Sequence, residues 1–165
     1  MYKTLLTIAI LGVLILLTSA YYTAPADSRI GYKAPALVLG NNNNGLSPLQ
    51  QHRGGNILLT FWSSADVESR LSNKHYDSMS RIDGMSFTHV SVNMDRSEGV
   101  FNSVVVLDSL DRTANFGTSL DAQEVIIKSW RLEDGYHSFL IDAQGTIIAI
   151  DPQDNELASL RESIR

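Results

Sequence analysis

The pattern of apolar and polar positions changes most abruptly where an apolar run over residues 56–62 gives way to small, hydroxylated and charged residues over 63–70. The run has the length and aromatic ending of a buried strand, and the residues after it have the pattern of a helix start. Ser63 or Ser64 is a candidate N-cap, while Asp66 and Glu68 lie where the helix dipole favours negative charge. Strand-to-helix junctions of this kind carry the functional sites of α/β proteins, so this is the first candidate site.

The helix that follows the run is predicted over residues 65–82, because Gly84 is a helix-ending residue. An approximate apolar stripe is formed by five of its residues, Val67, Leu71, Tyr76, Met79 and Ile82. We expect this stripe to face the core.

Other strands and helices alternate along the chain. Strands are predicted over residues 34–39 (an edge strand, because of Pro35), 85–94, 138–141 and 146–150, the last two forming a hairpin. Further helices are predicted over 120–132 and 155–164, with a short turn of helix over 46–49 and a hairpin loop over 41–45. Residues 100–110 fit either a helix or a strand. The order predicts an α/β fold with a central mixed sheet flanked by helices.

The first 23 residues are predicted to be a targeting segment, because residues 5–17 are almost continuously apolar after the positive charge of Lys3. This segment is either a cleaved signal peptide or an uncleaved anchor that spans the membrane with residues 4–22. Residues 24–33 have the composition of a tether, and residues 34–165 form a single domain. We therefore expect an extracytoplasmic protein on the periplasmic side, anchored in the inner membrane or secreted.

Charge and composition exclude several classes of function. The formal net charge is -5, with 13 Lys and Arg residues scattered among 18 acids, which does not fit a nucleic-acid-binding surface. The chain has no cysteine, which excludes disulfides, thiolate chemistry and thiolate zinc sites in this chain alone. Three of the histidines, His52, His75 and His89, lack partners at metal-ligand spacing, so no metal site or cofactor is predicted.

Four stretches in the right order resemble the thioredoxin-like proteins of the extracytoplasmic TlpA/ResA branch. They are residues 30–35, residues 46–49 with Gly54 and Gly55, residues 59–64, and the closing hairpin over 139–147. The resemblance covers about residues 30–165 and implies a thioredoxin-like three-layer sandwich. It also implies the ancestry of a thiol-disulfide oxidoreductase.

The functional residues of that family do not carry over to this sequence. The resemblance puts the two catalytic cysteines at Asp66 and Ser69, and the cis-proline that faces them at Tyr136. Disulfide exchange requires a thiolate nucleophile, and Asp66 cannot attack and release a disulfide. The resemblance therefore implies a degenerate redox site, with no catalytic residue retained.

A retained groove is the main functional hypothesis, in which the chain is a non-catalytic binding or scaffolding module for an unknown protein or peptide. Its walls would include Trp62, Ala65, Asp66, Tyr136 and His137, because the loop at Tyr136 holds a bound peptide in the family.

Two enzymatic alternatives stay open. One is a new polar centre that combines Asp66, Glu68, Ser69 and His137. The other is a protein related to thiol-disulfide oxidoreductases that acts with the thiols of a partner. The complete absence of cysteine favours the binding module over both.

Overall fold

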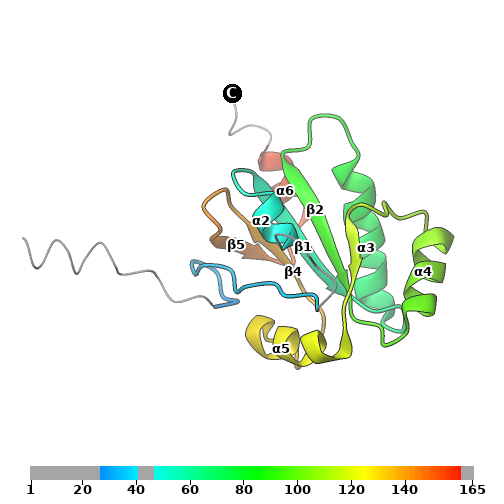
Figure 1. Cartoon of the computed structure of the whole chain (residues 1–165). Helices are drawn as coiled ribbons and strands as arrows, with labels where there is room; N and C mark the ends of the chain where they lie inside the picture. The colour runs from blue at the N-terminus through cyan, green and yellow to red at the C-terminus, as the bar shows by residue number, and fades with distance from the viewer. Residues whose placement is uncertain (1–26, 41–46, 161–165) are drawn as a thin grey trace, which may run out of the picture.

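The computed structural model describes residues 27–40 and 47–160, which include a five-stranded sheet of order β3-β2-β1-β4-β5 (Figure 1). Strands β1 to β3 are parallel, whereas β4 is antiparallel to both β1 and β5. The strands are β1 Asn56–Trp62, β2 Phe87–Asn93, β3 Asn115–Gly117, β4 Ser138–Ile141 and β5 Ile147–Ile150. The helices are α2 Pro48–Gln51, α3 Val67–Ser80, α4 Glu98–Leu107, α5 Leu120–Trp130 and α6 Asp154–Ser159.

Both faces of the sheet are covered, which gives the predicted three layers. Alternate residues of β1 point to opposite faces, so Leu59 and Phe61 pack with α5 while Leu58 packs with α3 and α6. Trp62 belongs to a third cluster with α4. A strand covered on both faces is a continuous apolar run, as the sequence shows here. The prediction of a mixed sheet flanked by helices is confirmed.

Residues 98–107 form a helix, which settles the choice that the sequence left open. Ser97 is the N-cap, and its side chain accepts a hydrogen bond from the Val100 N–H. Phe101, Val104 and Val105 lie on one face of the helix and pack with Trp62. Tertiary packing therefore overrides the local strand preference of the three consecutive valines.

The predicted strand over residues 34–39 is wrong, because this stretch is extended but pairs with no neighbouring strand. Leu37 and Leu39 do point into the core beside α5, as an alternating pattern requires. Pro35 has no N–H to donate, and the chain runs over a face of the sheet rather than along its edge. The pattern therefore predicted the side-chain alternation correctly and the backbone pairing incorrectly.

The predicted apolar stripe of α3 is confirmed at Tyr76 and Met79, which are buried in the core, and wrong at its other three positions. Val67 and Leu71 are 70% and 61% exposed, while Asn73 and Asp77 are fully buried on the opposite face. The buried face is held by hydrogen bonds: Asn73 donates to the side chain of Asn115 at 3.2 Å, and Asp77 accepts from the backbone N–H of Asp111 at 3.0 Å. Buried polar groups are stable when they are paired in this way, so the core side of α3 combines these two polar residues with the apolar Tyr76 and Met79.

Five predicted segments lie wholly or partly outside the described residues: the leader over 1–23, the first part of the tether over 24–33, the loop over 41–45, the start of the helical turn over 46–49, and the end of the C-terminal helix beyond residue 160. Within residues 27–40 and 47–160, no helix has the length and apolar character needed to cross a membrane.

Candidate functional site

The junction between β1 and α3 is fixed by the side chain that caps the helix. Asp66 is the N-cap, and its Oδ1 accepts a hydrogen bond from the Ser69 N–H at 2.8 Å. The Ser69 hydroxyl donates to the Asp66 carbonyl at 3.4 Å and accepts from the Ser63 N–H at 3.3 Å. Interaction with Ser69 lowers the pKa of Asp66, so its carboxylate is charged at neutral pH. Both residues at the expected redox positions are thus engaged in forming the helix start.

A second carboxylate, Asp95, holds the loop that precedes the cap. Because β1 and β2 are parallel and in register up to Trp62 and Asn93, their carboxyl ends lie side by side. Asp95 follows β2 and accepts hydrogen bonds from the Ser63 hydroxyl at 2.7 Å and the Ser64 N–H at 3.0 Å. Burial alone would raise the pKa of Asp95, but hydrogen bonds from Ser63, Asn93 and Ser64 outweigh it and lower the pKa.

Across from this helix start is the loop that leads into β4. The His137 carbonyl accepts a hydrogen bond from the Phe61 N–H at 3.1 Å, which continues the pairing of β1 with β4 by one step. Tyr136 precedes it and is partly buried, and burial raises the pKa of its phenol, helped by the charges of Asp95 and Asp66. The phenol is therefore neutral at physiological pH. The loop places Tyr136 and His137 opposite the N-terminus of α3.

A hydrogen bond that the sequence patterns did not predict lies at this loop. The His137 Nδ1 is 2.7 Å from Asp151 Oδ2, and Asp151 Oδ1 accepts the Ser138 N–H at 2.8 Å. Asp151 has a φ of 48°, a left-handed conformation that few residues other than glycine adopt. The register of the predicted hairpin could have indicated this contact. Phe139 pairs with Ile150, so the next step of the hairpin places Ser138 opposite Asp151.

These residues surround a hollow of about 240 Å³, which we call the helix-tip hollow. It contains four of the predicted residues, namely Asp66, Ser69, Tyr136 and His137, and Glu68 of the alternative polar centre. The other lining residues are Phe61, Ser72, Asp134, Gly135, Ser138 and Asp151.

Two predicted groove residues do not line the helix-tip hollow. Trp62 is fully buried, and its indole N–H donates to the Ser91 hydroxyl at 2.8 Å while its ring packs on Phe101. Its side chain points to the α4 face of the sheet, because the strand period of two places it opposite Phe61. Ala65 lies in the turn before the cap and is not among the residues around the hollow.

The chemistry of the helix-tip hollow is acidic. Four carboxylates, Asp66, Glu68, Asp134 and Asp151, face one imidazole, and none of the described residues that line it is Lys or Arg. Ser69 is 5% exposed and its hydroxyl is already bonded twice, which does not suit a nucleophile. In the described part of the chain, no three His, Asp or Glu residues are arranged to hold a metal ion. Without a cysteine anywhere in the sequence, this chain has no thiol for disulfide exchange.

Comparison with solved structures identifies the fold as thioredoxin-like. A thioredoxin-like protein from Parabacteroides distasonis is 25% identical and superposes with a TM-score of 0.69 over 83% of this chain and 97% of that one. The thioredoxin domain of a thiol-disulfide oxidoreductase from Bacteroides vulgatus is 20% identical, with a TM-score of 0.66 over 82% and 97% of the two chains.

A thiol:disulfide interchange protein from a Bacteroides species is 20% identical, with a TM-score of 0.63 over 82% of this chain and 88% of that one. No protein-family model and no curated protein sequence matches the chain. The molecule therefore has the thioredoxin-like fold of thiol-disulfide oxidoreductases in a chain that contains no cysteine.

Proposed function

We propose that this protein is a non-catalytic member of the TlpA/ResA branch that acts outside the cytoplasmic membrane and binds an extended segment of a partner protein at the helix-tip hollow. The apolar leader in the sequence supports a location outside the cytoplasm. The absence of thiols supports the loss of redox chemistry. Two of the similar structures are a thiol-disulfide oxidoreductase domain and a thiol:disulfide interchange protein, and this chain cannot perform thiol-disulfide chemistry alone.

The proposal rests mainly on the backbone N–H and C=O of Tyr136, which are unpaired within the described part of the chain. Neither its N–H nor its C=O has a hydrogen-bond partner among the described residues, although the residues on both sides of the hollow are held in place. An unpaired backbone beside a hollow can pair with an extended segment, and the hollow then accepts one of its side chains. The Tyr136 ring, partly buried at this wall, supplies an apolar surface for that segment.

The proposal is tested by photo-crosslinking in cells with a reactive residue at Ser72, which lines the hollow, compared with one at Thr88, an exposed residue near the start of β2. We expect a discrete adduct from Ser72 alone. The adduct should disappear in Tyr136→Ala, which removes the aromatic wall, and persist in Tyr136→Phe, which keeps it. Equal adducts from both positions, or an adduct that tolerates Tyr136→Ala, would exclude binding at the hollow.

The non-catalytic part of the proposal is tested by insulin reduction with the full chain and dithiothreitol. The expected rate is that of dithiothreitol alone, because the chain supplies no thiolate. A rate above that background, with or without added partner thiols, would show that the protein is an oxidoreductase after all. The proposed location is tested separately by fusing alkaline phosphatase to the C-terminus, which becomes active only outside the cytoplasm.

A second candidate function is proton transfer by His137, which the 2.7 Å contact with Asp151 favours. When neutral, the imidazole donates its Nδ1–H to this carboxylate and therefore presents Nε2 as a base. Hydrolysis of 4-nitrophenyl acetate by the wild-type protein and by His137→Gln would measure this activity. Equal rates for the two proteins would remove this candidate.

A further inference from the structure

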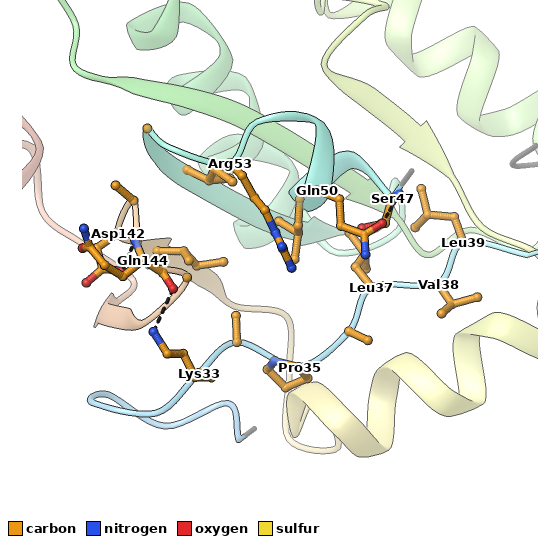
Figure 2. Close-up of a pocket in the computed structure, with 18 of the residues that line it drawn as sticks. Lys33, Pro35, Leu37, Val38, Leu39, Ser47, Gln50, Arg53, Asp142 and Gln144 are labelled. Atoms are coloured by element: carbon orange, nitrogen blue, oxygen red, sulfur yellow. Dashed lines mark hydrogen bonds between the residues drawn. The ribbon is translucent and has the colours of Figure 1, made fainter. Parts of the chain in front are cut away.

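A second and larger cavity lies at the opposite end of β1 from the helix-tip hollow. Its volume is about 740 Å³, and it is enclosed by the extended segment over residues 33–40, by α2 with the residues that follow it, and by the turn between β4 and β5 (Figure 2). Ile57 at the start of β1 and Ile141 at the end of β4 form part of its wall. A volume of this size is within the range of small-molecule binding sites.

The walls of this cavity, which we call the α2 cavity, combine apolar side chains with a single uncommitted cation. Leu37, Leu49 and Ile57 supply apolar surface and belong to the main core cluster or pack against it. Figure 2 shows the Arg53 side chain extending from the end of α2 into the space in front of the extended segment. Among the described residues, its guanidinium has no hydrogen-bond or ion-pair partner.

The other charged groups of the α2 cavity are already engaged. Lys33 Nζ donates to the Gln144 carbonyl at 2.7 Å and to the Thr146 hydroxyl at 3.1 Å. Asp142 Oδ1 accepts the backbone N–H groups of Gln144 at 3.0 Å and Thr146 at 2.8 Å. These bonds hold the turn that closes one side of the cavity. Among the described residues, two cations and one carboxylate thus line the α2 cavity, and Arg53 is the charge left for a ligand.

The extended segment adds backbone donors to the same wall. Ala36, Leu37 and Val38 line the α2 cavity, and their N–H groups have no partner within the described residues. The segment is anchored at both ends, because the Ala34 N–H donates to the Gly145 carbonyl and the Leu39 carbonyl accepts from the Ser119 N–H. Because both ends of the segment are held in place, the unpaired N–H groups between them are preorganised next to the apolar side chains of the cavity.

We propose that the α2 cavity binds a small organic acid that carries one carboxylate on an apolar body. The carboxylate pairs with the Arg53 guanidinium, whose planar fork matches a carboxylate with two parallel hydrogen bonds. The apolar body lies against Leu37, Leu49 and Ile57. This inference concerns a site separate from the helix-tip hollow and does not depend on the proposed partner binding.

The test uses 4-phenylbutyrate as the probe, with 4-phenylbutan-1-ol and 4-phenylbutylamine as neutral and cationic analogues, and measures binding to the full chain by saturation-transfer NMR. We expect the carboxylate to bind at least tenfold more tightly than the alcohol, because charge-assisted hydrogen bonds to Arg53 are lost in the alcohol. The amine should not bind. Equal affinity for acid and alcohol, or absence of binding by the acid, would overturn the proposal.

Two variants locate the bound probe. Arg53→Gln should weaken 4-phenylbutyrate about tenfold or more and leave the weak binding of the alcohol unchanged. Arg96→Gln is the matched control, since Arg96 is an exposed arginine beyond the opposite end of β2 and its loss changes the net charge equally. Ala36→Glu, at an exposed position of the cavity wall, should weaken the acid and not the alcohol. An equal effect of Arg53→Gln and Arg96→Gln would show a nonspecific charge effect and refute the assignment.

Discussion

The buried histidine of β2 predicts how the stability of the fold depends on pH. His89 is 3% exposed, its Nε2 lies 3.2 Å from the Thr60 hydroxyl, and its Nδ1 has no partner among the described residues. Burial lowers the pKa of His89 to about 3, with Arg81 acting in the same direction and Asp111 opposing it. In the unfolded chain this imidazole has its ordinary pKa of about 6.5.

The sign of the effect follows from the two pKa values. Between pH 6.5 and 3 the unfolded chain binds a proton on this imidazole and the folded protein does not, so acid favours unfolding. The resulting loss of unfolding free energy is about 1.4 kcal/mol between about pH 7.5 and 5.5, and about 2.7 kcal/mol by about pH 4.5. Carboxylates with lowered pKa values, such as Asp95 and Asp108, add to this loss only near and below the ordinary pKa of Asp.

The assay is urea unfolding, followed by tryptophan fluorescence, at half-unit pH intervals from 7.5 to 5. The His89→Gln variant should lose most of the slope between pH 6.5 and 5, whatever its stability at neutral pH. Val90→Ala provides a destabilised control, because it truncates a fully buried neighbour on the same strand without removing a titrating group. If His89→Gln keeps the wild-type slope, buried neutral His89 does not account for the acid sensitivity.

Three further predictions concern α3 and its start. The double variant Asp66→Cys with Ser69→Cys should contain two thiols that an oxidant converts into one intramolecular disulfide, as measured by thiol titration. Two thiols that do not form a disulfide with each other would contradict the assignment of the redox positions. Asp77→Ala should lower the unfolding free energy by about 3 kcal/mol, because the buried donors around this carboxylate lose their acceptor, whereas the exposed Leu71→Ala should change it by less than about 0.5 kcal/mol. Arg70→Gln breaks the ion pair with Asp108 at 2.7 Å and should cost about 1 kcal/mol or less in urea unfolding, and high salt should reduce that cost.

Sequence patterns predicted the fold well where one periodicity dominates. The continuous apolar run of β1 predicted the centre of the sheet, and the two short apolar segments on either side of a turn predicted its antiparallel side. The same rules failed on α3, because they assume that the core side of a helix is apolar. Here Asn73 and Asp77 are buried through partners in β3 and in the loop before it, more than thirty residues away, and no local window contains that information.

The candidate site was predicted in part. The family resemblance was enough to predict that Asp66, Tyr136 and His137 lie together, and the β1–β4 pairing is what joins the junction to the loop. Trp62 was also assigned to the groove, but the strand alternation turns its side chain to the other face of the sheet. Asp151 could not be assigned from residue type alone, because its role depends on a hairpin register and a left-handed backbone that bring its carboxylate to His137.

The pairing of β1 with β4 has a kinetic consequence. Thr60 and Ser138 are 78 residues apart in sequence, whereas the first pair of β1 with β2 joins Asn56 to Phe87. Closing the longer loop costs about 0.8 kcal/mol more chain entropy than closing the shorter one, and long-range contacts of this kind slow folding. The loop with Tyr136 and His137 reaches α3 only when β4 docks, so a chain emerging from the ribosome can complete the parallel half of the sheet before the helix-tip hollow is closed. The proposed partner could therefore bind only after the last third of the chain has folded.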